Sequence, residues 1–399
     1  MAGGHPEFTG ADEENQRTAL AEYIRRGLKP DLWWIDAGWY RCHYDWGVTG
    51  DWIPDAERFP HGLAPIGEDC RRAGVDFLLW FEPERVRTST AFCREHPDWL
   101  LPRKKSPDDL LVNLGCRACC DTIIDTIDAL IKESGIRVYR QDFNFSPASV
   151  WAEAEAEDRV GAVENAHVQG LLRLWDTLLD RNPGLWIDMC ASGGRRNDLE
   201  TMRRAVPLHY TDIGYGDHPV KQKQHRQMFE WIPYFRAHNM SWDDPVTGEY
   251  TKPGRPADAY SYYVAMAPCM TDMTPYDADE ERFALARKMQ AIWRRASALM
   301  LTGDFYPLTE CRESARDFFA VQFHDPETGR GMVEIVSNNA NPDERFTVRF
   351  AGLEPGARYL LTNAETGARR ELTAEEMASG VEYALPRRSG LIDFYEKKV

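Results

Sequence analysis

The segment YRQDFN, residues 139–144, lies at the end of a helix-to-strand unit. Residues 121–134 (DTIIDTIDALIKES) have the periodicity of an amphipathic helix, Gly135 ends it, and the apolar run 136–139 predicts a short strand. Asp142 follows the carboxyl end of that strand. In parallel α/β barrels, reactive side chains collect at this end of the strands. Asp142 is therefore our candidate for the central catalytic residue.

The same order of helix, glycine and strand recurs along the first three-quarters of the chain. The predicted strands are residues 31–36, 75–84, 136–139, 185–190 and 208–214, and the predicted helices are 13–27, 62–74, 121–134, 160–181, 198–206 and 281–300. Residues 260–270 fit either a helix or a strand. This alternation predicts an α/β fold, a (β/α)8 TIM-type barrel over residues 1–302.

The pattern of apolar and polar residues changes after Gly303. Apolar and polar residues alternate between Gly, Pro and Asn turns in the segments 318–325, 331–339, 345–353, 358–367 and 390–398. Alternation with period two predicts antiparallel strands with one buried face. We expect a small C-terminal antiparallel β-sandwich domain over residues 303–399.

Charge and composition exclude several classes of partner. The net charge of −16 argues against binding nucleic acid or an anionic membrane. No run of 18 apolar residues predicts a membrane span, and the first residues lack the basic and apolar regions of a signal peptide. Nine cysteines, an odd number, favour reduced thiols and a cytoplasmic location.

Neither a metal nor a cofactor is expected. Cys116, Cys119 and Cys120 form one zinc-like CxxC, but no second CxxC or histidine pair completes a tetrahedral site. Residues 193–196 (GGRR) lack the context of a dinucleotide-binding loop.

Carboxylates end several of the predicted strands, among them Asp36, Asp142 and Asp212. Two carboxylates facing one cleft are what a glycosidase requires, one to attack or activate water and one to protonate the leaving oxygen. The alternative is that each is a helix cap or loop acceptor. Arg140, two residues before Asp142, points to the same side of the strand, where its charge would lower the pKa of Asp142 and its donors would reach substrate hydroxyls.

Four blocks in order carry a resemblance. They are residues 50–86 (with GDW, FPHGL and LWFEPE), 96–101 (HPDWLL), 135–144 (with YRQDFN) and 190–198 (CASGGRRND). Together they resemble glycoside hydrolase family 36, the melibiase or α-galactosidase family, over about residues 12–310. The resemblance implies a retaining α-galactosidase that hydrolyses terminal α-galactosides of oligosaccharides or glycosides by double displacement.

The resemblance also implies roles for individual residues. Asp142 would be the nucleophile and Asp212 the general acid/base, with Asp217 as the second candidate for the latter. The substrate-binding residues would be Asp36 and Arg140 at sugar hydroxyls, Trp80 as an apolar wall, and Cys190 and Ser192 near the 2-hydroxyl.

The sequence departs from the family at three places. The family's aspartate pair before Gly-Trp is Asp36-Ala37 here, and its Lys-Trp before the nucleophile is Arg140-Gln141, so a related α-glycosidase or transglycosidase with another sugar specificity is the rival reading. Only about twelve residues precede the first helix, so either the chain is a fragment or the first barrel strand is degenerate. A carbohydrate-binding fragment of weak activity is thus the other alternative. Homo-oligomers are common among such relatives.

Overall fold

The computed structural model describes residues 8–101, 108–243, 250–255 and 257–398. Residues 1–7, part of the short stretch before the first predicted helix, lie outside them. The chain folds into two compact units, Met1–Thr211 and Asp212–Val399. The boundary predicted at residue 303 from the change in sequence texture lies within the second unit.

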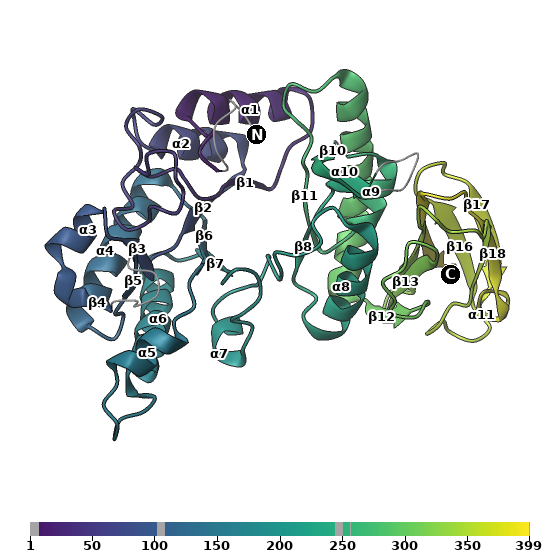
Figure 1. The fold of residues 1–399 in the computed structure, drawn as a ribbon. Coiled ribbons are helices and arrows are strands. Elements are labelled where there is room, and N and C mark those ends of the chain that lie inside the picture. Colours follow the sequence, from purple (N-terminus) through teal and green to yellow (C-terminus); the bar gives the residue numbers. More distant parts are fainter. Residues whose placement is uncertain (1–7, 102–107, 244–249, 256, 399) are drawn as a thin grey trace. The chain divides into compact units, whose positions relative to one another are not determined.

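The first unit is built on a parallel sheet in the order β1-β2-β6-β7 (Figure 1). Its strands are β1 (Leu32–Ile35), β2 (Asp76–Phe81), β6 (Val138–Gln141) and β7 (Trp186–Met189). The helices that precede them are α1 (Glu13–Arg25), α2 (Ala64–Ala73), α4 (Arg117–Ser134) and α6 (Ala162–Arg181). Four predicted helix-to-strand units are thereby confirmed.

Glycine ends two of these helices because the chain must reverse there. Gly74 and Gly135 both have positive φ, 63° and 66°, the left-handed conformation that caps a helix without a Cβ penalty. Each cap turns the chain directly into a buried strand, and Asp142 follows the strand after Gly135.

Small elements surround the carboxyl side of the sheet. Three short strands, β3 (Arg85–Arg87), β4 (Leu100–Leu101) and β5 (Asp109–Val112), form an antiparallel sheet between β2 and α4 in the chain. The short helices are α3 (Ala91–Glu95), the 3₁₀ turn Pro97–Trp99, α5 (Ala148–Ala154) and α7 (Leu199–Met202).

The strand predicted at 208–214 is wrong. Only Val206 bridges to Asp188 of β7, and the residues that follow form turns and irregular chain. The next N–H, of Leu208, donates to the Asp188 carboxylate at 3.0 Å instead of to a backbone carbonyl. A side chain therefore replaces the sheet partner at this point.

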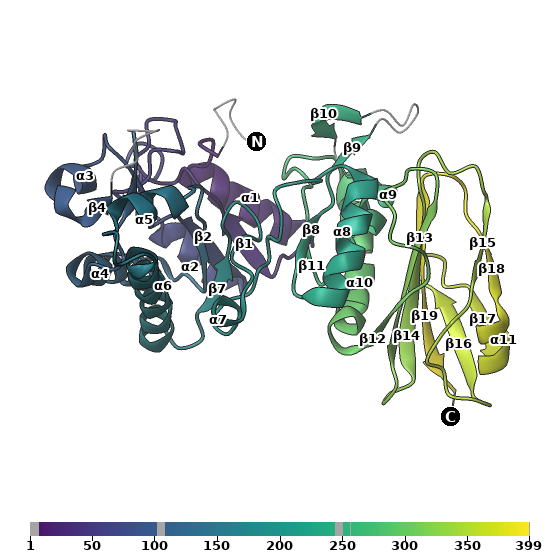
Figure 2. The same cartoon turned by 60° about the horizontal axis from the view of Figure 1, so that its bottom comes forward.

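The second unit begins with helices and short strands. They are α8 (His218–Trp231), β8 (Arg236–His238), β9 (Ser241–Asp243), β10 (Tyr250–Arg255), α9 (Ala259–Val264), β11 (Cys269–Thr271) and α10 (Glu280–Thr302). Strands β8 and β11 pair in parallel, and α8 lies beside α10 in both views (Figures 1 and 2). The undecided segment 260–270 is helix over residues 260–264 and irregular over 265–268, and its last two residues begin β11.

An antiparallel sheet of six strands, in the order β12-β13-β14-β19-β16-β17, follows in this unit (Figure 2). Its strands are β12 (Asp304–Pro307), β13 (Phe318–Asp325), β14 (Arg330–Ser337), β16 (Arg358–Asn363), β17 (Arg369–Thr373) and β19 (Ser389–Lys397). The pair β15 (Arg345–Val348) and β18 (Val381–Ala384), with α11 (Ala374–Ser379), shares a core with it. The predicted antiparallel β region is confirmed.

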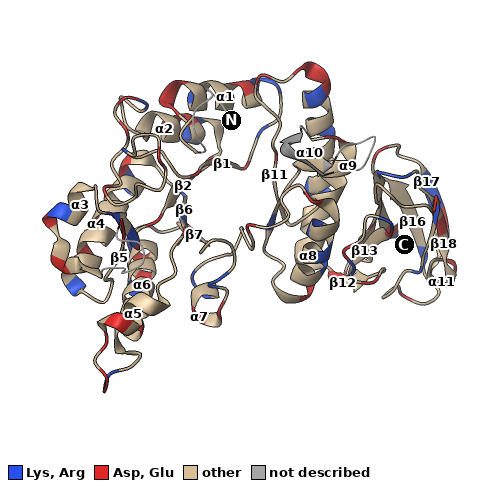
Figure 3. Cartoon of the chain, viewed as in Figure 1, with Lys and Arg blue, Asp and Glu red and all other residues tan. Residues whose placement is uncertain are grey.

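Acidic and basic residues are interspersed along the ribbon of each unit (Figure 3). Among the described residues, no helix combines the length and the apolar character needed to cross a membrane.

Candidate functional site

Asp142 occupies the first position after β6, and four hydrogen-bond donors hold its carboxylate. Oδ1 accepts from the backbone N–H groups of Phe143 (2.7 Å) and Ser192 (3.1 Å). Oδ2 accepts from Asn144 Nδ2 (2.8 Å) and Trp80 Nε1 (3.3 Å). The side chain is therefore fixed in position, as a nucleophile or a charged ligand-binding group must be.

The pKa of Asp142 is lowered to about 2. Burial raises it, since the residue is only 8% exposed, but the charge of Arg140 and hydrogen bonds from Asn144, Cys190 and the Ser192 backbone outweigh burial. Asp142 is consequently a buried carboxylate that stays ionised at any ordinary pH.

Arg140 is the charged neighbour that the sequence predicted beside Asp142. Its guanidinium bonds Asp188 at 2.5 Å, lies 3.6 Å from Asp36, and covers the ring of Trp34 at 4.7 Å. Asp188 is fully buried and Asp36 is about one-third exposed. Burial lowers the pKa of Arg140, yet these carboxylates raise it well above its ordinary value, so the cation persists.

Asn144 joins the Asp142 carboxylate to a second, buried one. Its backbone N–H donates to Glu82 at 2.5 Å, and its side-chain oxygen accepts from the Ser192 hydroxyl at 2.8 Å. Glu82 is itself paired with Arg85 through two contacts of 2.6 and 2.9 Å. Burial raises the pKa of Glu82 even though Arg85 opposes the shift. This glutamate therefore supports the loop after β6.

Glu84, three residues after β2, is the centre of a second network of hydrogen bonds and ion pairs. Gln141 donates to it at 2.7 Å, His167 Nε2 lies 2.8 Å away, and Arg196 pairs with both oxygens at 2.6 and 2.7 Å. Burial raises the pKa of Glu84, but Arg196 and His167 outweigh it and lower the value to about 2. Gln141 stands where the family has tryptophan. Its side-chain amide is hydrogen-bonded to the buried side chains of Glu84, Tyr139 and Trp175.

Trp80 and Cys190 are both buried and both hydrogen-bond to the Asp142 carboxylate. Trp80 is 1% exposed, stacks on Tyr40, and reaches Asp142 through its indole N–H. Cys190 is 2% exposed, and burial raises the pKa of its thiol, so it remains protonated. The structure thus gathers Asp36, Trp80, Arg140, Asp142, Cys190 and Ser192, the six candidates from the first unit. Their roles toward substrate stay predictions.

The acid/base candidates belong to the other unit. Asp212 is its first residue and is exposed, and its carboxylate accepts from the Tyr215 hydroxyl at 3.2 Å. Asp217 caps α8 by accepting from the Val220 N–H at 3.3 Å. The capping bond gives Asp217 a structural task, which leaves Asp212 as the preferred candidate.

Sequence reasoning missed Asn144 and Asp188 as site residues. Asn144 lies two residues past Asp142 in the quoted segment, and a polar side chain so close to the strand end was a usable signal. Asp188 stands inside a predicted strand, where an aspartate is unfavourable unless paired. An aspartate inside a buried strand indicates a buried cationic partner, but the sequence does not identify Arg140 as that partner.

Within the described ranges, no group of three or more His, Cys, Asp or Glu side chains is arranged to hold a metal ion. Cys119 and Cys120 are buried in the start of α4, and burial raises the pKa of both thiols.

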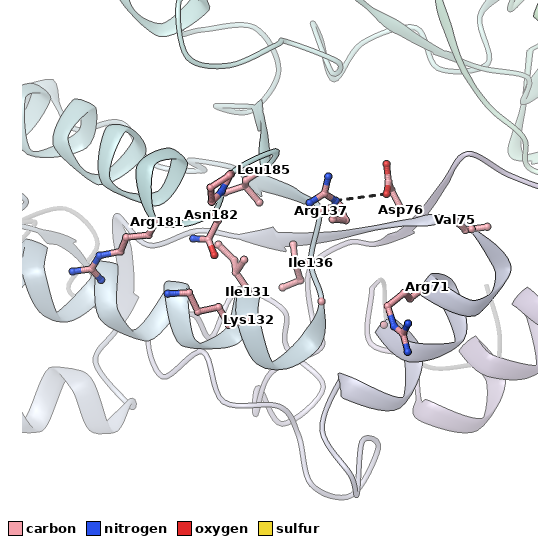
Figure 4. Close-up of a pocket in the computed structure, with 14 residues that line it drawn as sticks. Arg71, Val75, Asp76, Ile131, Lys132, Ile136, Arg137, Arg181, Asn182 and Leu185 are labelled. Carbon is pink, nitrogen blue, oxygen red and sulfur yellow. Dashed lines mark ion pairs between the residues drawn. The ribbon is translucent and has the colours of Figure 1, made fainter.

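A separate pocket opens at the amino ends of the same strands (Figure 4). Asp76 starts β2 there and lies 3.8 Å from Arg137. Arg71, Lys132 and Arg181 also line the pocket, the last two away from Asp76 in Figure 4. Since Asp142 follows the carboxyl end of β6, this pocket lies at the opposite end of the sheet and takes no part in the candidate site.

Comparison with known proteins matches the melibiase family model to residues 11–213, about half of the chain. The chain belongs to the melibiase family. This confirms the resemblance seen in the sequence, and the matched span includes every candidate residue of the first unit as well as Asp212.

Curated relatives of this melibiase-family chain extend further. It is 26% identical over 375 residues to probable α-galactosidase G of Aspergillus terreus, covering 88% of this chain and 49% of that protein. It is 29% identical over 360 residues to α-galactosidase 1 of Pediococcus pentosaceus, covering 88% and 48%. The chain therefore spans about half the length of the curated relatives it matches.

Solved structures share its fold. The family 36 α-galactosidase AgaA of Geobacillus stearothermophilus superposes with a TM-score of 0.82 at 23% identity, covering 98% of this chain and 54% of that one. The likeness shows that the mixed α/β fold with a β-rich C-terminal region is the fold of these enzymes.

Proposed function

We propose that the chain is a retaining α-galactosidase that hydrolyses terminal α-galactosides of oligosaccharides or glycosides. The observation that carries the proposal is the ionised, four-fold hydrogen-bonded carboxylate of Asp142 at a strand end within the melibiase match. A retaining glycosidase needs such a carboxylate as its nucleophile. A family 36 relative has been solved with raffinose, which supports an oligosaccharide as the substrate.

In this mechanism the Asp142 carboxylate attacks the anomeric carbon while Asp212 donates its proton to the leaving oxygen. A covalent glycosyl–enzyme forms, and Asp212, now a base, takes a proton from the water that releases the sugar. Arg140 donates hydrogen bonds to sugar hydroxyls, and Asp36 accepts hydrogen bonds from them. Trp80, Cys190 and Ser192 complete the sugar subsite. Retention requires the Asp142 and Asp212 carboxyl groups to approach to about 5–5.5 Å.

Hydrolysis of p-nitrophenyl α-galactoside by the full chain tests the proposal. Asp142→Ala should lower kcat by at least ~10³-fold. Azide should restore part of the turnover, because it replaces the missing nucleophile. The matched control is Asp98→Ala, an exposed aspartate in the turn Pro97–Trp99, which should leave turnover unchanged. Wild-type activity in Asp142→Ala would refute the nucleophile assignment.

A second candidate is a related α-glycosidase or transglycosidase with another sugar specificity. Ala37 follows Asp36 where the family has a second aspartate, and Arg140 is engaged with Asp36 and Asp188. A planar guanidinium presents different donors from a lysine. A panel of aryl α-glycosides, with the ratio of hydrolysis to transfer measured for each, separates the two candidates.

A third candidate is a carbohydrate-binding fragment of weak activity, favoured by the chain spanning about half of its relatives. Galactose binding without turnover on any α-glycoside of the panel would favour it over the enzyme.

We also infer a (β/α)8 barrel over residues 1–302 and a β-sandwich domain over 303–399. The parallel strands of the first unit support the barrel, and the shared core of β15, β18 and the six-stranded sheet supports the sandwich. The nine cysteines, none of which forms a disulfide in the described part of the chain, fit a reducing, cytoplasmic compartment. Sedimentation of the purified chain would test for a homo-oligomer.

A further inference from the structure

Strand β1 carries two neighbouring tryptophans, and they face opposite sides of the sheet because successive side chains of a strand alternate. Trp33 faces helix α1, where its indole N–H donates to Gln16 at 3.1 Å. Trp34 faces the other side, which it shares with Asp36, two residues further along the chain. Trp34 therefore lies beside the polar side chains that are proposed to contact sugar hydroxyls.

Trp34 makes two contacts with those polar side chains. Its indole N–H donates to Asp36 Oδ2 at 2.8 Å. Its ring lies against the guanidinium of Arg140, whose central carbon is 4.7 Å from the ring centre. The first contact is a hydrogen bond to a carboxylate and the second is a cation–π contact. One aromatic side chain thus holds both polar groups.

Asp36 is the more accessible of the two polar groups. Its side chain is 30% exposed, whereas that of Arg140 is 4% exposed. Asp36 Oδ1 accepts the backbone N–H of Ala37 at 2.9 Å, and Oδ2 accepts the Trp34 indole. A carboxylate has about four lone-pair positions, so about two are left for a ligand among the described residues.

The orientation of this carboxylate depends on both hydrogen bonds. The terminal torsion of an aspartate has a broad energy minimum, so the Ala37 N–H alone would let the carboxylate plane turn. The Trp34 bond to the second oxygen fixes the plane. A group that is held in its binding orientation loses less entropy when a ligand binds, and it places the ligand more accurately.

We propose that Trp34 is a positioning residue of the sugar subsite, which fixes the Asp36 carboxylate so that two neighbouring sugar hydroxyls donate to it. This inference rests on the proposed function, since that function places the sugar at Asp36. Trp34 acts through Asp36 and has no need to touch the substrate itself.

Trp34→Phe in the full chain tests the inference, because it removes the indole N–H and keeps an aromatic ring beside Arg140. On p-nitrophenyl α-galactoside, kcat/KM should fall at least ~10-fold, as expected for the loss of a hydrogen bond to a charged group. The acid limb of the pH profile should stay in place, because the Arg140 cation remains.

Trp33→Phe is the matched control. It removes an indole hydrogen bond from the same strand, but on the face toward α1, so kcat/KM should stay unchanged. Thermal unfolding of both variants separates a loss of stability from a loss of positioning. An equal fall of kcat/KM in the two variants would overturn the proposal.

An Asp36→Ala background shows whether Trp34 acts through Asp36. There, Trp34→Phe should change kcat/KM by less than ~2-fold, because the bond that it removes no longer exists. Wild-type kcat/KM in Trp34→Phe, or the same fold-loss with and without Asp36, would overturn the proposal. Absence of turnover in the wild-type chain would instead refute the proposed function. The galactose affinities of the same variants, measured by calorimetry, would then decide on Trp34 by the same comparisons.

Discussion

At Asp142, burial and charge act in opposite directions on the ionisation of one carboxyl group. Burial alone favours the neutral acid, and Arg140 with the surrounding donors reverses the balance, so that the pKa falls to about 2. The sequence predicted this partner from its position two residues earlier on the same strand. It could not predict Asp188, because the ion pair joins residues 48 positions apart.

Arg140→Gln should move the acid limb of kcat/KM. The nucleophile must be ionised, and removal of the nearby cation raises the pKa of Asp142 from about 2. Activity should therefore be lost at a higher pH than in the wild type, by about 1–3 units. The measurement is the pH profile of kcat/KM on p-nitrophenyl α-galactoside.

Two variants serve as controls for this shift. Arg140→Lys keeps the charge and should keep the acid limb near its wild-type position. Arg137→Gln removes a half-exposed arginine just before the same strand and should change nothing. An unmoved limb in Arg140→Gln would mean that Arg140 does not set the ionisation of Asp142.

Helix α6 approaches the chain around Leu114 so closely that it needs a glycine. A Cβ on Gly170 would lie 2.1 Å from the Leu114 carbonyl oxygen and 2.6 Å from its carbon. Backbone atoms cannot swing aside as the end of a side chain can. The helix would therefore have to move away from the core.

Gly170→Ala should destabilise the first unit by about 1–3 kcal/mol in urea unfolding, because the helix is displaced. Gln169→Ala is the matched control, since it changes the exposed neighbour on the same helix. In the absence of a clash, alanine would stabilise a helix by about 1 kcal/mol relative to glycine. A stabilised Gly170→Ala protein would contradict the close approach.

At the scale of elements, the sequence predicted those whose cause is local. Strands β1, β2, β6 and β7 are apolar runs bounded by helix-ending residues. The C-terminal strands were predicted equally well, from their alternation of apolar and polar residues. The prediction for 208–214 failed because the carboxylate of Asp188, 20 residues away, accepts the N–H of Leu208 in place of a backbone carbonyl. Residues 260–270 were ambiguous because a buried helix and a buried strand are both apolar throughout.

Across the whole molecule, buried carboxylates have pKa values shifted in both directions. In the first unit the pKa values of Asp142 and Glu84 are lowered to about 2, from 3.8 and 4.5. Each lends stability that is present above its unfolded pKa and lost as the pH falls toward 2, about 2–3 kcal/mol apiece. In the second unit, burial raises the pKa of Glu334 on β14 well above 4.5.

A raised carboxyl pKa has the opposite consequence for stability. Its contribution is fully present below pH 4.5 and is lost as the pH rises through the folded value. Glu334→Gln, which cannot ionise, should therefore stabilise the β region at pH 7 by about 0.5–2 kcal/mol and have no such effect at pH 4. Because the two units can unfold separately, hydrogen exchange of the β14 amides is the measurement. Glu382→Gln, an exposed glutamate on β18, is the control and should leave that exchange unchanged at both pH values. Equal protection of β14 in wild type and Glu334→Gln at pH 7 would mean that the buried carboxyl does not limit the stability of this sheet.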